Sequence, residues 1–310
     1  MRSSGLHYPE VIPDCNRLRD CRGVIRCRTP PGKYMKAIDI TSPWGTYRPK
    51  GPAALILSLC RRLPANSRFY YSLIKTLRGP LRKFGVRPYD VVIENLRLRL
   101  MNRGNYCETT ALFAPQFYDR EEIAWLCAEL SEGGAFMDIG GNVGLYSLFV
   151  ARRLDGKVDI FTVEPHPELN GRMMFNVREN GLSINLVSVA LSDYEGEGAL
   201  ALSSHQDGQN ALNRSGDARM SIKVKVTTLS TLCRGMNISG IRALKIDVEG
   251  HEYPILKHFF SNTEKTIWPQ AIVIEHVHDK DNVINYLLDH GGYRIEGRTR
   301  RNLLLKRMIS

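Results

Sequence analysis

The chain contains 310 residues with 43% hydrophobic content and a formal net charge of +11. This length can bury a full hydrophobic core and allows one or two domains. The charge is concentrated at the front, because residues 1–100 carry 20 Lys and Arg against 6 Asp and Glu, whereas the remaining 210 residues are net −3. A catalytic domain that acts on nucleic acid is expected to carry basic side chains around its active site. The slightly acidic remainder therefore argues against a nucleic acid as the partner.

Residues 1–34 are rich in Arg and Pro and show no sustained helix or strand period. Three cysteines occur there at a spacing of six, namely Cys15, Cys21 and Cys27. Zinc sites favour closer pairs and a signal peptide has an apolar core, so we expect a disordered or non-native leader with Met35 as a candidate start. The four other cysteines lack framework spacing, which is typical of a reducing, cytoplasmic protein.

Residues 35–89 are expected to form a basic helical N-terminal extension. Within them, residues 51–86 alternate short apolar runs with Arg and Lys, and these runs are too short to span a bilayer. They could be amphipathic helices on an anionic membrane surface, or helices that cap the catalytic domain with solvated basic faces. The second interpretation is favoured, and peripheral contact with the inner face of the membrane stays open.

Residues 90–133 lead into the catalytic core. Apolar and basic residues alternate over 91–101, which predicts a half-exposed strand that opens a small hairpin. Asp119 and Glu122 have the spacing of a capping box, so a helix is expected after Asp119. Gly133 and Gly134 are expected to end that helix.

The most informative segment is residues 135–147, which read A-F-M-D-I-G-G-N-V-G-L-Y-S. The pattern predicts a buried strand over 136–139, a glycine turn and a helix over 143–154. Glycines allow a tight turn and a close approach of the backbone to a ligand, and ligands of open α/β sheets bind at such strand ends. The dinucleotide fingerprint G-x-G-x-x-G is absent, so a nucleoside that carries an amino acid fits better than a pyrophosphate.

A second apolar strand over 158–163 ends in Glu164 and Pro165. A carboxylate at this position can accept hydrogen bonds from both hydroxyls of a ribose. A helix over 167–180 and a third strand over 184–189 are expected to follow.

Residues beyond the third strand predict an accessory antiparallel pair and the rest of the sheet. The pair is expected over 199–202 and 222–226, joined by a polar loop, 203–219, that could form a lid. The fourth and fifth strands are expected over 243–247 and 272–276, with an antiparallel edge formed by 293–295 and 303–305. This alternation predicts an α/β fold, a three-layer sandwich around a mostly parallel, Rossmann-like sheet.

Four motifs occur in order, namely D-I-G-G-N-V-G-L-Y-S, V-E-P-H-P, V-A-L-S-D and L-K-I-D-V-E-G-H-E. Together they resemble the FkbM-type S-adenosylmethionine-dependent methyltransferases, and the methyltransferase domain is expected over residues 90–310. The resemblance implies S-adenosylmethionine as cofactor and a small-molecule or glycan acceptor, methylated on a hydroxyl of a sugar, a polyketide or a similar metabolite. The fucose of a lipo-chitooligosaccharide is one such acceptor. The expected cofactor-binding residues are Asp138, Gly140, Gly141, Asn142, Gly144, Glu164, Pro165, Ser192 and Asp193.

The ends of the fourth and fifth strands carry the candidates for catalysis. Methyl transfer to a hydroxyl calls for a base, and general-base catalysis contributes about 10²–10⁴-fold. The candidates are Asp247, Glu249, His251, Glu275, His276 and His278, with Lys245 beside them.

Three of these carboxylates, Asp247, Glu249 and Glu275, could instead bind Mg²⁺, as in O-methyltransferases that act on catechols or polyketides. The metal-free mechanism is preferred, because Lys245 can neutralise the cluster. A non-catalytic S-adenosylmethionine-binding protein is a further alternative, since a fold does not fix a function. An enzyme that methylates amino groups of nucleic acids would be expected to carry N/D-P-P-Y/F, which is absent.

Overall fold

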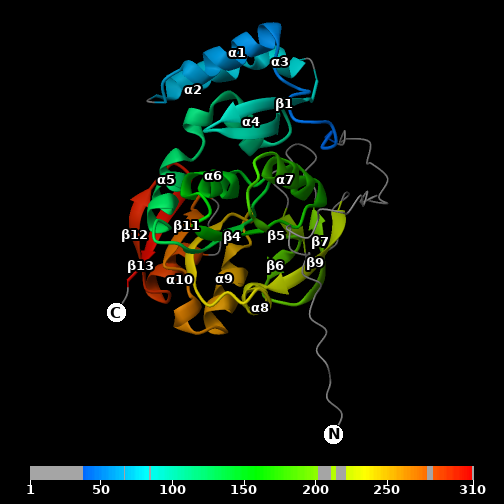
Figure 1. Ribbon diagram of the computed structural model, residues 1–310. Helices are drawn as coiled ribbons and strands as arrows, with labels where there is room; N and C mark the ends of the chain where they lie inside the picture. Colours follow the sequence, from blue (N-terminus) through cyan, green and yellow to red (C-terminus); the bar gives the residue numbers. More distant parts are fainter. Residues whose placement is uncertain are drawn as a thin grey trace.

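The computed structural model describes residues 38–65, 67–83, 85–201, 211–213, 221–277 and 282–308 (Figure 1). The expected leader, 1–34, lies outside the described residues. So do His278 and most of the expected lid, 203–219.

A seven-stranded sheet forms the centre of the molecule, in the order β12-β13-β11-β10-β3-β4-β5. The five strands from β11 to β5 are parallel, and β13 is antiparallel to both of its neighbours. The strands are β3 (Gly134–Ile139), β4 (Val158–Val163), β5 (Asn185–Val187), β10 (Ile241–Ile246), β11 (Ala271–Glu275), β12 (Tyr293–Arg298) and β13 (Asn302–Arg307). The predicted mostly parallel sheet with an antiparallel edge is thereby confirmed.

Helices cover both faces of the sheet and complete the predicted three layers (Figure 1). One apolar cluster packs α5, α6 and α7 against one face, and a second packs α8, α9 and α10 against the other. The helices are α5 (Arg120–Glu129), α6 (Leu145–Leu154), α7 (Pro167–Glu179), α8 (Leu229–Gly235), α9 (Glu252–Ser261) and α10 (Val283–Asp289). Among the described residues, no helix is both long enough and apolar enough to cross a membrane.

The expected third strand, 184–189, is wrong in extent. The central sheet takes only β5, and the chain then enters a second sheet of order β6-β9-β7-β8, built from β6 (Ala190–Ser192), β7 (Gly196–Ala201), β8 (Ala211–Asn213) and β9 (Ser221–Thr228). Val187 pairs with Val163 of β4, whereas Ala190 pairs with Val226 of β9. The predicted antiparallel pair corresponds to β7 and β9.

The N-terminal extension consists of three helices on one side of the molecule, followed by a hairpin and a short helix (Figure 1). These elements are α1 (Gly51–Arg62), α2 (Arg68–Leu77), α3 (Gly79–Lys83), β1 (Pro88–Ile93), β2 (Leu96–Met101) and α4 (Tyr106–Phe113). The predicted hairpin is present, because β1 and β2 pair in antiparallel orientation. The predicted strand over 91–101 is wrong in extent and exposure, because Glu94 and Asn95 form a turn and most of β2 is buried. One continuous apolar cluster joins the three helices to the catalytic core.

The predicted capping box at the start of α5 does not form. Asp119 has φ +33 and makes no cap hydrogen bond; its carboxylate accepts a hydrogen bond of 3.0 Å from the hydroxyl of Tyr146. Glu122 instead accepts hydrogen bonds from Thr299 and Asn302 near the far end of the chain. Tertiary partners therefore replace the local cap.

Candidate active site

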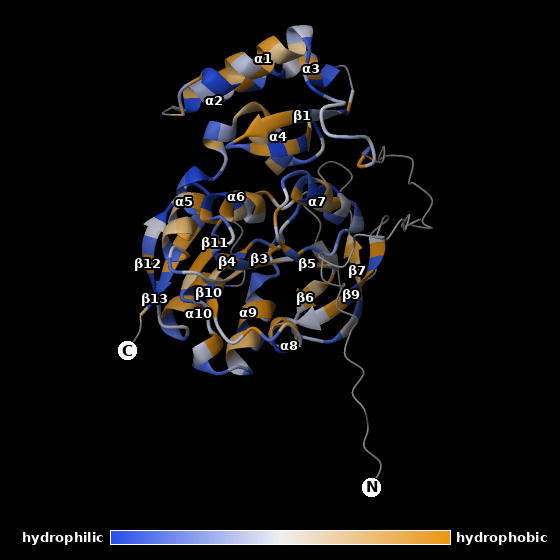
Figure 2. Cartoon of the chain, viewed as in Figure 1, coloured by the Kyte–Doolittle hydropathy of each residue, from blue (hydrophilic) through white to orange (hydrophobic). Residues whose placement is uncertain are grey.

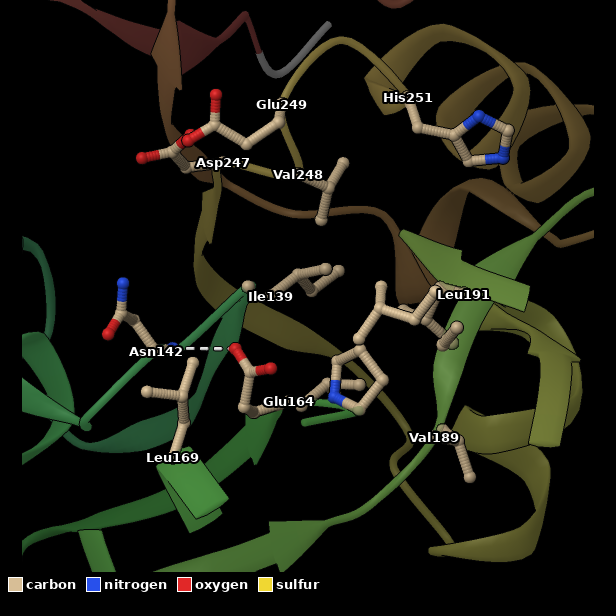
Figure 3. A pocket seen from close by; sticks show the side chains of 15 residues that line it. Ile139, Asn142, Glu164, Leu169, Val189, Leu191, Asp247, Val248, Glu249 and His251 are labelled. Atoms are coloured by element: carbon tan, nitrogen blue, oxygen red, sulfur yellow. Dashed lines mark hydrogen bonds between the residues drawn. The ribbon is translucent and has the colours of Figure 1, made fainter. Parts of the chain in front are cut away.

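A pocket of about 590 Å³, including its open mouth, lies at the carboxyl ends of β3, β4 and β10. From β3 the chain proceeds outward to β4 and β5 and then returns to β10 on the other side of β3. The pocket therefore occupies the point where the strand order reverses, which is where open α/β sheets bind ligands. Figure 3 shows Glu164 and Asp247 on different sides of it.

The glycine turn after β3 owes its shape to close backbone packing. Gly140 has φ +73, and a Cβ atom there would overlap the carbonyl oxygen of Asp247. A Cβ on Gly141 would overlap the side chain of Thr162, and one on Gly144 would meet Met173. Of these three predicted cofactor-binding glycines, Gly140 lines the pocket, and all three allow the surrounding elements to approach closely.

Glu164 follows β4 and lines the pocket, as its predicted role requires. One carboxylate oxygen accepts a hydrogen bond of 2.9 Å from the backbone N–H group of Asn142 (Figure 3). The other accepts a hydrogen bond of 2.8 Å from the backbone N–H group of His166. The side chain is buried, and this burial raises the pKa of Glu164 to about 7 although the two N–H groups lower it. The carboxylate is thus fixed in direction beside the glycine turn.

The side of the pocket next to Glu164 is apolar. Pro165 lines it just before α7. Leu169 of α7, Val189 just before β6 and Leu191 of β6 line it as well (Figure 3). Leu200 of β7 adds a further apolar side chain. This wall suits a flat, uncharged ring adjacent to the group that Glu164 binds.

Asp247 lies directly after β10, and its backbone N–H donates to the carbonyl of Ile139, at 3.1 Å. The side-chain oxygen Oδ1 is buried and has no hydrogen-bond partner among the described residues. Buried polar atoms are normally paired, so this oxygen, in a residue that lines the pocket, is suited to a hydrogen-bond donor on a ligand.

Glu249 and His251 also line the pocket, from a turn held by Glu252. The Glu252 carboxylate accepts hydrogen bonds from the N–H groups of Val248, at 2.8 Å, and Gly250, at 3.3 Å, and burial raises its pKa. Glu252 is a positioning residue that sequence reasoning did not assign, although it ends the fourth motif.

Lys245 and Asp138 lie beneath the turn and are not among the residues that line the pocket. The ammonium group of Lys245 donates to the carbonyl of Gly140, at 2.9 Å, and stands 3.5 Å from Asp138. Burial lowers the pKa of Lys245, but the charges of Asp138 and Asp247 outweigh this and the pKa is raised. Ser147 donates to the other Asp138 oxygen, so the pair supports the turn from below.

Ser192 is linked to the pocket through His251, and Asp193 is linked to Ser192. The Ser192 hydroxyl is buried, donates to Asp193 at 3.0 Å and lies 2.9 Å from His251 Nε2. Neither Ser192 nor Asp193 is among the pocket-lining residues. The structure therefore links them to the orientation of the His251 ring.

Glu275 is the last residue of β11 and His276 follows it; both lie outside the pocket lining. Glu275 Oε1 accepts two hydrogen bonds from Arg301, at 2.5 and 3.0 Å, and His276 Nε2 lies 3.4 Å from the carbonyl of Thr299. Their catalytic roles stay predictions. Among the described residues, no group of three or more His, Cys, Asp and Glu side chains is arranged to hold a metal ion. The Mg²⁺ alternative at Asp247, Glu249 and Glu275 stays a prediction.

The start of α4 borders the site, a contribution that the sequence did not predict. Asn105 caps α4 and its amide donates to the Asn142 side chain, at 2.6 Å. The next residue, Tyr106, is exposed, and the Arg301 guanidinium lies 5.5 Å from its ring centre. The N-terminal part of the chain therefore contacts the glycine turn directly.

No curated protein matches the chain. Similar solved structures include precorrin-6y C5,15-methyltransferase from Geobacter metallireducens, which is 13% identical with a TM-score of 0.37 over 62% of this chain and 89% of that one. The Pyrococcus abyssi tRNA (uracil-54, C5)-methyltransferase bound to S-adenosyl-L-homocysteine is 12% identical, with a TM-score of 0.40 over 71% of this chain and 42% of that one. The M. jannaschii TYW2 complex with AdoMet is 11% identical, with a TM-score of 0.37 over 71% of this chain and 87% of that one.

The family comparison is more specific than these structural likenesses. The model of the methyltransferase FkbM domain matches residues 138–295, which contain the glycine turn, Glu164 and Asp247. This match covers half of the chain and runs from the end of β3 into β12. The chain therefore belongs to the FkbM methyltransferase family.

Proposed function

We propose that this protein transfers a methyl group from S-adenosylmethionine to a hydroxyl group of a sugar or glycan. The observation that carries the proposal is the pair of carboxylates on different sides of one pocket. Glu164 is fixed by two backbone N–H groups, whereas Asp247 has a buried oxygen without a partner among the described residues. One carboxylate suits the ribose of the donor, and the other suits the hydroxyl of the acceptor.

The residues of the pocket fit S-adenosylmethionine. Glu164 can accept hydrogen bonds from the two ribose hydroxyls, with the apolar wall of Val189, Leu191 and Leu200 beside it for the adenine ring. The glycine turn and the end of β10 then remain for the methionine portion and the transferred methyl. When bound, S-adenosylmethionine supplies a methyl group on a positively charged sulfur atom.

The acceptor would enter beside Asp247, between the end of β10 and the start of α4. Tyr106 offers an exposed aromatic face, and its hydroxyl lies 3.2 Å from that of Tyr71, which restrains the ring. Aromatic faces pack well against the apolar C–H face of a sugar ring. Arg301 and Glu275 neutralise each other, so this surface suits a neutral polyol better than a strongly charged acceptor.

Asp247 is the proposed base and positioning group for the acceptor. It would accept the hydroxyl proton while the new oxygen–carbon bond forms and the sulfur–carbon bond breaks. Lys245 is held beside the turn with its charge next to Asp138, which keeps the neighbouring backbone in place. Positioning the two reacting groups contributes up to roughly 7–11 kcal/mol in such reactions.

Among sugar acceptors, the fucose of a lipo-chitooligosaccharide nodulation factor is the specific candidate, because the size and motif arrangement of the chain resemble the rhizobial enzyme that 2-O-methylates this fucose. Incubation of the protein with labelled S-adenosylmethionine and fucosylated or unfucosylated chitooligosaccharides tests both levels of the proposal by product mass spectrometry. Methylation of fucose supports the specific acceptor, and methylation of other sugars supports only the broader class. Activity that disappears with EDTA and returns with Mg²⁺ would favour the metal-dependent alternative.

A further inference from the structure

The N-terminal helices carry an unusual charge pattern. The sequence contains no Asp or Glu between Asp39 and Asp90, whereas it contains ten Lys and Arg in that interval. Eight of the ten are exposed, namely Arg48, Lys50, Arg62, Arg68, Lys75, Arg82, Lys83 and Arg87. A solvated face of a globular protein usually mixes both signs of charge, so this segment presents a uniformly positive surface.

Large apolar side chains are exposed on the same helices. Leu55 and Leu59 lie one turn apart on α1 and are 62% and 47% exposed, and Phe69 at the start of α2 is 70% exposed. The opposite faces are occupied, because Leu57, Cys60 and Ile74 are buried in the core. Figure 2 shows apolar and polar residues alternating along α1 and α2 at the side of the molecule remote from α8 and α9.

Exposed Leu and Phe among Lys and Arg fit a surface that is apolar at one depth and anionic at another. An anionic lipid bilayer has an apolar interior beneath negatively charged headgroups. Amphipathic helices bind its interface by burying apolar side chains and by electrostatic attraction of their basic side chains to the anionic lipids. A nucleic acid would use the cations but would leave the two leucines in water. We propose that α1 and α2 form a docking surface for an anionic membrane, hereafter the basic apolar face.

The basic apolar face connects to the proposed acceptor site through α2. Tyr71 on α2 reaches the hydroxyl of Tyr106, and Arg301 lies over the ring of Tyr106. Membrane binding is independent of the proposed methyl transfer, because none of Leu55, Leu59 and Phe69 lines the pocket.

Co-sedimentation of the full chain with vesicles tests the proposal. Vesicles of phosphatidylcholine alone are compared with vesicles that also contain phosphatidylglycerol, at low and high salt. We expect binding only to the anionic vesicles, weakened by salt, since each Lys or Arg near such a surface contributes about fivefold in the binding constant. L55S/F69S and R68Q/K75Q should each reduce binding at least tenfold. The matched controls I295S, on β12, and K225Q, on β9, should bind as the unmodified chain does, and all variants should keep its melting temperature.

The other outcomes overturn the proposal. Equal binding to both vesicle types, or equal losses in the control variants, would show that the basic apolar face is not responsible. A chain that ignores vesicles but forms a dimer that L55S/F69S dissociates would assign the face to self-association. Absence of both vesicle binding and dimer formation would likewise overturn the proposal. Binding of an RNA oligonucleotide that needs Arg68 and Lys75 but not Leu55 and Phe69, without vesicle binding, would assign a nucleic acid.

Discussion

The backbone at Gly140 lies against Asp247 so closely that a Cβ atom on residue 140 would overlap the Asp247 carbonyl oxygen. This contact joins the end of β3 to the end of β10 and fixes the distance between the two halves of the pocket. The requirement for glycine therefore comes from the protein itself, in addition to any approach of a ligand.

Gly140→Ala should separate the two strand ends. We expect a lower melting temperature and loss of S-adenosylmethionine binding, measured by thermal unfolding and calorimetry. Gly156→Ala is the matched control, because Gly156 has a similar φ of +77 but nothing within 4 Å of the added Cβ. Gly156→Ala should lower the free energy of unfolding only by the backbone strain, about 1–2 kcal/mol. Equal effects of the two substitutions would assign the Gly140 requirement to φ alone.

Glu164→Ala should weaken S-adenosylmethionine binding by about 1.5–3 kcal/mol for each charged hydrogen bond lost. Isothermal titration calorimetry measures this effect, and Glu132→Gln, at an exposed position, is the control. Unchanged affinity in Glu164→Ala would remove Glu164 from the cofactor site.

The pKa of Glu164 makes a pH dependence a second test of its role. Burial raises the folded pKa to about 7 from the ordinary 4.5, so the unliganded carboxyl is protonated below about 7. Ribose hydroxyls donate best to the ionised form, and affinity should therefore rise as pH increases through this value. The free energy of unfolding should change with pH in the opposite direction, because the native state binds the proton of Glu164 more tightly than the unfolded state does. This stabilisation of the native state is lost as pH rises from 4.5 to about 7. Glu164→Gln should abolish both trends.

Asp247→Asn should lower single-turnover rates by about 10²–10⁴-fold if Asp247 takes the acceptor proton. Affinity for S-adenosylmethionine should change much less, because Glu164 and the apolar wall remain. Asp289→Asn, at an exposed position of α10, should have no effect. His276→Ala should lower the rate less than Asp247→Asn, since its ring lies outside the pocket lining; a larger loss in His276→Ala would transfer the role of base to His276.

Tyr106→Ala should raise the KM for a sugar acceptor, because the aromatic face beside Arg301 is removed, while the affinity for S-adenosylmethionine stays constant. Tyr106→Phe keeps the ring and loses only the hydroxyl near Tyr71, so it should retain most of the acceptor affinity. Steady-state kinetics with a varied acceptor separates the two. Equal KM values for all three proteins would exclude Tyr106 from the acceptor site.

The sequence predicted those features that local patterns determine. The strand over 158–163 is found with the same bounds as β4, because its apolar run is delimited by the Gly156 turn and by Pro165. Gly140 and Glu164 lie together in the pocket because both follow adjacent parallel strands.

The features that the sequence did not predict depend on contacts between residues distant in sequence. Glu122 binds Thr299 and Asn302 instead of capping α5, and Asn105 reaches Asn142 from an element that has no motif of its own. The segment 184–189 has one apolar pattern, yet its end turns toward β9, which only the position of the second sheet determines. Such partners leave no signal in a local window of sequence.

The central claim is methyl transfer to a sugar hydroxyl in the pocket between Glu164 and Asp247. The most direct test is mass spectrometry of sugar and chitooligosaccharide acceptors incubated with methyl-labelled S-adenosylmethionine and either the unmodified chain or Asp247→Asn. The account predicts one labelled methyl group on a sugar oxygen with the unmodified chain and a strongly reduced yield with Asp247→Asn. Label found on nitrogen or carbon, or no methylated sugar although the protein binds S-adenosylmethionine, would contradict it.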